Sequence, residues 1–262
     1  MTVFEVARSH MLESQLRPNK VTDDRVLNAF ASIRRELFVP EHLRAVAYVD
    51  ENLPLGGGRY LMEPMVAARL LQEAALARTD AALIVGAGTG YEAALTAMLS
   101  RSVLALEEDP ELARRARAAL VEHAIASVSV VEGPLHEGYR LRSPYDVILF
   151  GGAVAETPPD INAQLAEGGR LLAVIKPFNS VGRATLTIRT GGVLARRVIF
   201  DAATPRLPGA SRRRSSSARV KSCSASARSP WRLAFRPRKL RVSANPRLSG
   251  WYCCRSCNAC SK

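Results

Sequence analysis

The strongest constraint on the fold is an alternation that begins after Asp80. Short β-type apolar runs are separated there by stretches of helical periodicity, which is typical of parallel strands joined by crossover helices. The runs predicted as strands are 81–85, 102–106, 128–131, 146–150 and 170–175, and the stretches predicted as helices are 91–99, 110–123 and the segment around Ile161 and Leu165 that stops at Gly168 and Gly169. The sequence therefore predicts an α/β fold with a mostly parallel sheet and helices on both faces.

The alternation changes at its end. The apolar runs 184–189 and 193–200 are separated only by Thr190, Gly191 and Gly192. Three residues are too few for a crossover helix, but they suffice for a β-hairpin. We therefore expect the sheet to finish in a C-terminal antiparallel hairpin.

The first 79 residues have a different pattern. Thr22, followed by two aspartates, predicts the start of a helix over 21–33. The stretch 38–60 is rich in proline and glycine, contains Gly56-Gly57-Gly58, and leads to Pro64, which suits the first turn of a helix over 65–77. We expect residues 1–79 to form a helical leader with a substrate-side loop, and residues 80–209 to form the core.

The net charge of +13 is unevenly distributed along the chain. Residues 1–209 hold 23 Lys and Arg against all 24 Asp and Glu, a net charge of −1, and they contain no cysteine. Residues 210–262 hold the other 14 Lys and Arg, no acid, all five cysteines and both tryptophans. A near-neutral, cysteine-free body without an apolar run long enough for a bilayer predicts a cytoplasmic protein with no membrane partner.

The Arg- and Ser-rich tail, residues 210–262, has two interpretations. It is a disordered polycationic arm for nucleic acid or acidic partners, with Trp231 and Phe235 as stacking groups. Alternatively, it is the product of a shifted reading frame, because it lacks acids and any sustained apolar period. Cys254, Cys257 and Cys260 have the spacing of half a metal site, but they crowd into the last ten residues without a histidine.

A glycine-rich turn follows the first predicted strand of the core. Its sequence is Gly86-Ala87-Gly88-Thr89-Gly90-Tyr91, which suits a tight strand-to-helix turn whose backbone approaches a ligand. Glu107 and Glu108 end the second strand, and Glu107 lies 21 residues after Gly86. An acid at that place can accept hydrogen bonds from both ribose hydroxyls, so the combination predicts a nucleoside-containing cofactor.

The glycine spacing narrows the choice of cofactor. Dinucleotide-binding loops have the spacing G-x-G-x-x-G, because a pyrophosphate sits on the helix N-terminus, whereas this loop has G-x-G-x-G followed by Tyr91 and Glu92. An acid in the first helical turn opposes a pyrophosphate but not a cofactor without phosphate. The spacing and the terminal hairpin favour S-adenosylmethionine over a nicotinamide or flavin dinucleotide.

Several motifs resemble one family over about residues 10–208. They are the leader from MLESQLRPNK to MVAARLL, the glycine loop, LALEEDPEL around Glu107, VVEGPLHEGY around Gly133, and Tyr145-Asp146 with VILFGGAVAETPP. This pattern is similar to the protein-L-isoaspartate O-methyltransferases, and the leader is peculiar to that family. The resemblance implies a class I S-adenosylmethionine-dependent methyltransferase fold and a protein-repair enzyme that methylates isoaspartyl carboxylates in damaged proteins. It also implies that Gly133 lies on the adenine side.

The sequence departs from the family pattern at three places. The serine of the Ile-Ser-x-Pro segment is Met62, the usual acid before the glycine loop is Ile84, and the usual Gly-Asp-Gly segment is Gly133-Pro134-Leu135. A thioether cannot donate a hydrogen bond, so the catalytic residue is unassigned. A methyltransferase with another substrate and an inactive cofactor-binding relative therefore stay open, beside a nucleic-acid-binding protein that acts through the tail.

The substrate side is expected between Gly56 and Pro64. Its candidate residues are Gly58, Arg59, Leu61, Met62 and Pro64. Arg59 is the one member with a charge, and a guanidinium can pair bidentately with a substrate carboxylate. No metal is predicted, because the four histidines, His10, His42, His123 and His136, lack metal-ligand spacing.

Overall fold

The computed structural model describes residues 2–211, which all belong to one compact unit. The predictions for the basic tail, namely the nucleic-acid arm, the cysteine half-site and the shifted frame, lie outside these residues. No helix within the described range has the length and apolar character that crossing a membrane requires.

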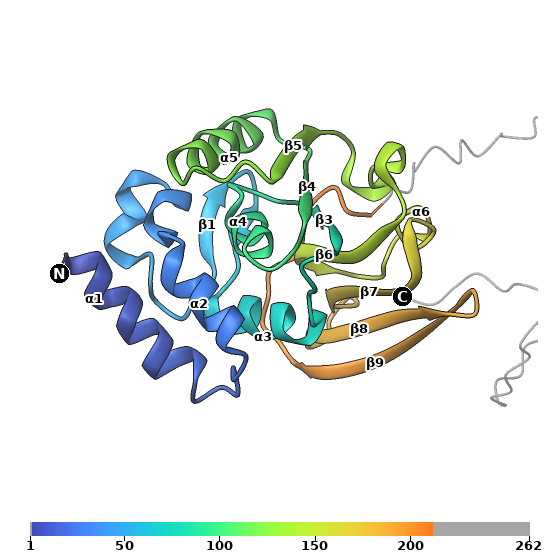
Figure 1. The fold of residues 1–262 in the computed structure, drawn as a ribbon, viewed down its shortest axis with the longest axis horizontal. Helices are drawn as coiled ribbons and strands as arrows, with labels where there is room; N and C mark the ends of the chain where they lie inside the picture. Colours follow the sequence, from blue (N-terminus) through green and yellow to red (C-terminus); the bar gives the residue numbers. More distant parts are fainter. Residues whose placement is uncertain (1, 212–262) are drawn as a thin grey trace, which may run out of the picture. The chain divides into compact units, whose positions relative to one another are not determined.

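A seven-stranded sheet forms the centre, in the order β5-β4-β3-β6-β7-β8-β9 (Figure 1). The pairs from β5 to β7 are parallel, and β8 and β9 continue the sheet antiparallel. The strands are β3 (Ala81–Val85), β4 (Ser102–Glu107), β5 (Val128–Glu132), β6 (Tyr145–Val154), β7 (Leu165–Ile175), β8 (Arg183–Thr190) and β9 (Val193–Asp201). The predicted α/β fold with a terminal hairpin is confirmed.

The two faces of the sheet carry separate hydrophobic clusters. Successive strand residues point to opposite faces, so Ala82 and Ile84 join one cluster while Leu83 and Val85 join the other. The first cluster packs against α2 (Asp24–Ser32), α3 (Pro64–Ala74), α4 (Tyr91–Ala97) and α5 (Pro110–Glu122). The central strands are therefore buried on both faces, which is why they stand out as continuous apolar runs.

The second face has less helix than the sequence predicts. Its helix α6 (Pro159–Asn162) has four residues, and Leu165 starts β7 instead of continuing a helix to Gly168. Leu165 pairs with Tyr145, and the carbonyl of its neighbour Gln164 accepts the Tyr145 N–H at 2.9 Å. The residues from Leu165 onward are therefore in a strand, although their spacing predicts a helix. The prediction for this helix was wrong in length.

The leader contains elements that the sequence does not predict. Helix α1 (Val3–His10) has no buried residue and begins with a capping box between Thr2 and Glu5. Asp23, rather than Thr22, caps α2 by accepting the N–H of Arg25 at 2.9 Å. The stretch predicted as a loop contains a small antiparallel hairpin, β1 (Leu53–Gly56) with β2 (Arg59–Leu61), which forms a separate two-stranded sheet.

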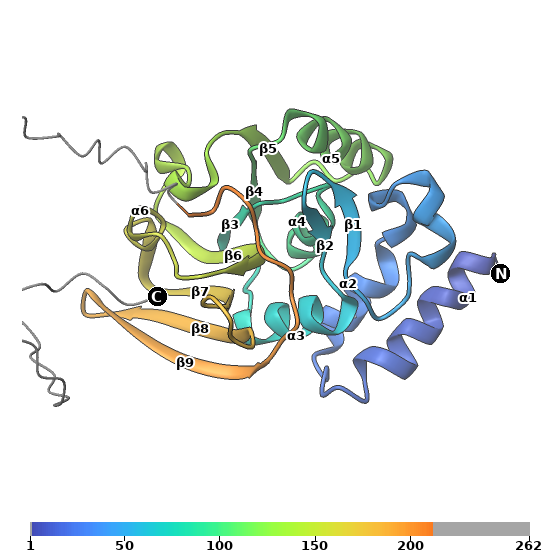
Figure 2. The same ribbon diagram turned by 180° about the vertical axis from the view of Figure 1, so that it is seen from behind.

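After β9 the chain returns to the middle of the sheet (Figure 2). We call residues 202–210 the C-terminal strap. Ala153 of β6 donates to the carbonyl of Pro205 at 2.9 Å and accepts from the N–H of Leu207 at 2.7 Å. Leu207 and Ala210 are buried in the second hydrophobic cluster. The strap is therefore part of the core, beside the strand ends where the site is predicted.

Candidate cofactor and substrate site

The glycine loop joins β3 to α4 at the carboxyl end of the sheet. Gly86, Gly88 and Gly90 have φ values of +77°, +55° and +94°, a backbone region that side chains disfavour. The N–H groups of Gly86 and Ala87 both donate to the carbonyl of Leu106, at 2.9 and 3.0 Å. The loop is therefore fixed to the end of β4, directly before Glu107.

This loop lies where the strand order reverses. β3 has β4 on one side and β6 on the other, and in open α/β sheets such a switch point is where ligands bind. The loop is also tied to the leader, because the hydroxyl of Thr89 donates to the carbonyl of Phe38 at 2.5 Å. The predicted location of the site at this edge agrees with the topology.

Glu107 is completely buried and accepts five hydrogen bonds. Three come from backbone N–H groups: Gly88 at 2.7 Å, Glu108 at 2.9 Å and Asp109 at 3.0 Å. The other two come from the guanidinium of Arg59, whose Nη1 and Nη2 each lie 2.7 Å from one carboxylate oxygen. The acid is therefore held rigidly at the loop, and its partner is a buried arginine with 6% exposure.

This pair joins two residues that the sequence assigns to different roles. Glu107 is predicted for the ribose and Arg59 for a substrate carboxylate, but the structure joins them directly. Glu108 is exposed and lies beside Gly209 of the strap: a Cβ built on Gly209 would be 1.8 Å from its Oε2. The sequence offers one signal for this pair: Arg59 lies two residues before the apolar Leu61, so on a strand both side chains point to the same face. In the structure both are buried on β2, and Tyr60 between them is exposed.

The strap covers the other side of the loop. A Cβ built on Gly86 would lie 2.6 Å from Cδ1 of Leu207 and 2.9 Å from Nη2 of Arg59. A Cβ built on Gly152 would lie 3.0 Å from Cβ of Leu207. The sequence analysis missed Leu207, because nothing in its local pattern indicates that the chain turns back over the glycine loop.

Most predicted substrate-side residues are buried. Leu61 and Met62 are each 1% exposed, and Pro64 begins α3, whereas Gly58 lies in the exposed turn of the small hairpin. The carbonyl of Met62 accepts from Nη2 of Arg35 at 2.8 Å. The Met62 side chain belongs to the first hydrophobic cluster, whereas the turn around Gly58 is exposed.

Behind Met62 lies a buried polar cluster formed by Arg35, Tyr91 and Glu92. Burial raises the pKa of Tyr91 to about 12, although the nearby Arg35 acts to lower it. Burial also raises the pKa of Glu92, although backbone N–H groups and Arg35 act to lower it. Within the described residues, Arg35 Nη1, the Tyr91 hydroxyl and Glu92 Oε1 are buried without a hydrogen-bond partner. The Tyr91 ring packs against Phe30 and Phe38, so it supports the loop from the core.

Gly133 lies next to Glu107. Its N–H donates to the carbonyl of Glu107 at 3.1 Å. The residues Glu132, Gly133, Pro134, Glu137, Gly138, Tyr139, Arg140 and Asp160 line a cavity of about 380 Å³ there. The end of β5 thus contributes Glu132 to the lining of this cavity.

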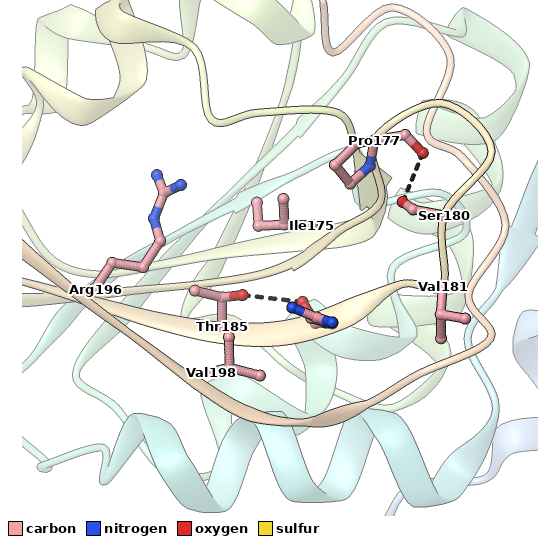
Figure 3. Close-up of a pocket in the computed structure, with 8 residues that line it drawn as sticks. Ile175, Pro177, Ser180, Val181, Thr185, Arg196 and Val198 are labelled. Carbon is pink, nitrogen blue, oxygen red and sulfur yellow. Dashed lines mark hydrogen bonds between the residues drawn. The ribbon is translucent and has the colours of Figure 1, made fainter.

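A second cavity lies on the outer strands (Figure 3). Its volume is about 410 Å³, and its lining is Ile175, Pro177, Ser180, Val181, Arg183, Thr185, Arg196 and Val198. No residue that the sequence analysis assigns to the site is among them. Within residues 2–211, no three His, Cys, Asp or Glu side chains gather so as to hold a metal ion.

Four features define the class of this protein: the sheet order, the terminal hairpin, the glycine loop and the acid that ends β4. They are those of a class I S-adenosylmethionine-dependent methyltransferase. A family model described as protein-L-isoaspartate(D-aspartate) O-methyltransferase matches residues 7–194. The chain belongs to this family, whose members are carboxyl methyltransferases. The family resemblance in the sequence is thereby confirmed.

Individual relatives give the extent of the similarity. A protein-L-isoaspartate O-methyltransferase of Koribacter versatilis is 42% identical over 172 residues, covering 66% of this chain and 78% of the relative. A solved protein-L-isoaspartate O-methyltransferase structure has a TM-score of 0.68 at 25% identity, covering 78% of this chain and 66% of the other. A structure from Plasmodium falciparum, described as a protein-L-isoaspartate O-methyltransferase in complex with S-adenosyl-L-homocysteine, has a TM-score of 0.66 at 18% identity. The match covers 79% of this chain and 99% of the other.

Proposed function

We propose that this chain transfers a methyl group from S-adenosylmethionine to the carboxylate of isoaspartyl residues, with the cofactor held at the carboxyl ends of β3 and β4. The observation that carries the proposal is the buried carboxylate of Glu107 beside a loop of left-handed glycines. Gly86, Ala87, Gly88 and Gly90 would form the cradle, Glu107 would accept the ribose hydroxyls, and Glu108 and Gly133 would flank the adenosyl group.

The donor set fits this cofactor. The loop has no Cβ atom at Gly86, Gly88 and Gly90, and the acid is fixed by three backbone N–H groups. A cavity lies beside Gly133, whose N–H donates to the carbonyl of Glu107. When bound, S-adenosylmethionine supplies an electrophilic methyl group on a sulfonium. Because the acceptor carboxylate is already anionic, the protein needs no general base and acts by holding the two groups in line and excluding water.

The substrate peptide would approach from the turn of the small hairpin. Gly56, Gly57 and Gly58 are exposed, and Gly58 lies beside Pro208 of the strap. Leu61, Met62 and Pro64 form the buried wall behind this turn, and Tyr91 supports the loop from the core.

We also propose a cytoplasmic location, supported by the absence of cysteine from residues 1–209. Any binding of nucleic acid is assigned to residues 210–262.

The test is methyl transfer from labelled S-adenosylmethionine to an isoaspartyl peptide, with the same peptide containing ordinary aspartate as the control. We expect label on the isoaspartyl peptide only, in a form that base releases as methanol. The proposal is overturned if the full chain binds S-adenosyl-L-homocysteine but methylates neither peptide.

A second candidate is methyl transfer to a different acceptor, and Met62 favours it. The buried thioether offers no hydrogen-bond donor at the position where the family has a serine. The variant Met62→Ser separates the two candidates. A rise in kcat on the isoaspartyl peptide indicates that the family geometry is retained, whereas cofactor binding without activity in either form favours another acceptor.

A further inference from the structure

The acceptor capacity of Glu107 is fully used in this structure. A carboxylate offers about four lone-pair sites, and five donors share them. The three backbone donors belong to the loop and to the segment after β4, which the sheet fixes. The two hydrogen bonds from Arg59 are therefore the ones that can break without disturbing the core.

Arg59 lies on the part of the site that is least attached to the sheet. It begins β2, and the β1–β2 hairpin forms its own two-stranded sheet. The preceding turn, Gly56 to Gly58, is exposed, and each of its glycines has a positive φ. Because the neighbouring turn is exposed, we expect the guanidinium to move toward it when the ion pair opens and to regain its hydration there.

We propose that Arg59 is an internal competitor of the cofactor ribose: in the ligand-free protein its guanidinium occupies the carboxylate that the ribose diol requires. This inference depends on the proposed function, because it assigns the ribose to Glu107. Binding then exchanges two N–H donors for two O–H donors on the same oxygens, while the backbone bonds from Gly88, Glu108 and Asp109 keep the acid in place.

The competition has a quantitative consequence. When only a fraction of molecules has a free Glu107, the apparent dissociation constant exceeds the intrinsic one by the inverse of that fraction. A buried bidentate pair between full charges keeps the fraction small. Replacing Arg59 by glutamine removes the charged bidentate pair, so the ligand should bind more tightly although a contact in the site has been lost.

The experiment is calorimetric titration of the full chain with S-adenosyl-L-homocysteine, in the wild type, Arg59→Gln and Arg59→Lys. The matched control is Arg114→Gln, which removes a surface arginine paired with Glu111. We expect roughly tenfold or greater tightening in Arg59→Gln, a smaller gain in Arg59→Lys and no change in the control. Thermal melting gives a second readout: without ligand Arg59→Gln melts lower, and it gains more from the ligand than the wild type.

Two nucleosides test whether the ribose is the competing group. Adenosine carries the diol and 2′,3′-dideoxyadenosine does not, so only adenosine should bind more tightly to Arg59→Gln than to the wild type. Equal or weaker binding of S-adenosyl-L-homocysteine by folded Arg59→Gln and Arg59→Lys overturns the competition, and so does an equal gain for both nucleosides. If neither the wild type nor these variants bind any of the ligands, the proposed function itself fails.

Discussion

Gly151 of β6 faces the carbonyl oxygen of Gly86, and a Cβ built on Gly151 would lie 2.2 Å from that oxygen. Real side chains do not approach a backbone oxygen so closely, so β6 and the glycine loop pack backbone against backbone. The first glycine of the loop is therefore positioned from two sides, by Leu106 of β4 and by Gly151 of β6.

Gly151→Ala should push the loop away from β6. We expect a loss of about 1–3 kcal/mol in the free energy of unfolding, as for other overpacked sites, together with weaker binding of S-adenosyl-L-homocysteine. Urea denaturation and calorimetry measure the two effects. Gly133→Ala is the stability control, since its added Cβ would lie 3.4 Å from Leu106, an ordinary contact. Equal stability of the two variants would contradict the packing argument.

Substituting the two members of the buried ion pair should lower the free energy of unfolding by unequal amounts. Glu107→Gln leaves the guanidinium of Arg59 buried without its anion, and we expect a loss of about 3–5 kcal/mol in stability. Arg59→Gln leaves Glu107 with three backbone donors, so its loss should be about 1–3 kcal/mol.

The double variant should be more stable than Glu107→Gln alone. Urea denaturation of all four proteins gives the coupling energy, which for residues in direct contact is about 0.5–3 kcal/mol. Strictly additive effects would show that the two side chains do not interact in solution.

Glu92 should make stability depend on pH in the direction opposite to most carboxylates. Burial raises its pKa in the folded protein above the ordinary value of 4.5, so the folded state binds more protons than the unfolded state. Its contribution to stability is present below pH 4.5 and is lost as the pH rises through the raised value. Glu92→Gln, which is always neutral, should therefore gain stability relative to the wild type as the pH rises.

The measurement for Glu92 is the difference in unfolding free energy between the wild type and Glu92→Gln from pH 4 to pH 8. Taking the difference cancels the contributions of the other acids to the pH dependence, because they titrate in both proteins. A difference that stays constant over this range would mean that Glu92 has an ordinary pKa in the folded protein.

The leader depends on a buried hydroxyl. Tyr48 donates to Glu36 Oε2 at 2.5 Å and accepts from Nε of Arg8 at 2.8 Å, and burial raises the pKa of Tyr48. Tyr48→Phe should lower the free energy of unfolding by about 1–3 kcal/mol, because Glu36 is 5% exposed and its Oε2 loses its donor, which leaves only the contact of Arg8 with Oε1. Tyr60→Phe, at a ring with 40% exposure, is the matched control and should have no effect in the same urea titration.

The core of the fold follows from the sequence because buried parallel strands must be apolar on both faces. The runs at β3, β4 and β6 are recognisable for that reason, and the short connection at Gly191 and Gly192 leaves a hairpin as the only choice. Helix α1 was missed because none of its residues is fully buried, and its apolar contact with the first cluster is limited to the partly buried Phe4 and Ala7. The C-terminal strap was missed because its position is set by contacts with β6, more than 50 residues earlier in the sequence.

The candidate site was predictable in part. The proximity of Gly88 and Glu107 follows from the rule that parallel strands end at one edge, so their spacing in the sequence was informative. The Arg59–Glu107 pair spans 48 residues and brings together two separate sheets, and no periodicity encodes such a contact. An arginine beside three glycines has the composition of a solvated loop, and only its alternation with Leu61 indicates burial.

The two charges of this pair are supported unequally, so substitutions at the two positions are not equally tolerated. Glu107 can stand alone on three backbone N–H groups, whereas Arg59 is buried with that carboxylate as its ion-pair partner. An arginine at position 59 without the acid would be an uncompensated buried cation, at a cost of several kcal/mol. The acid is therefore the member that the site requires, and arginine is the member that another residue can replace at a smaller cost in stability.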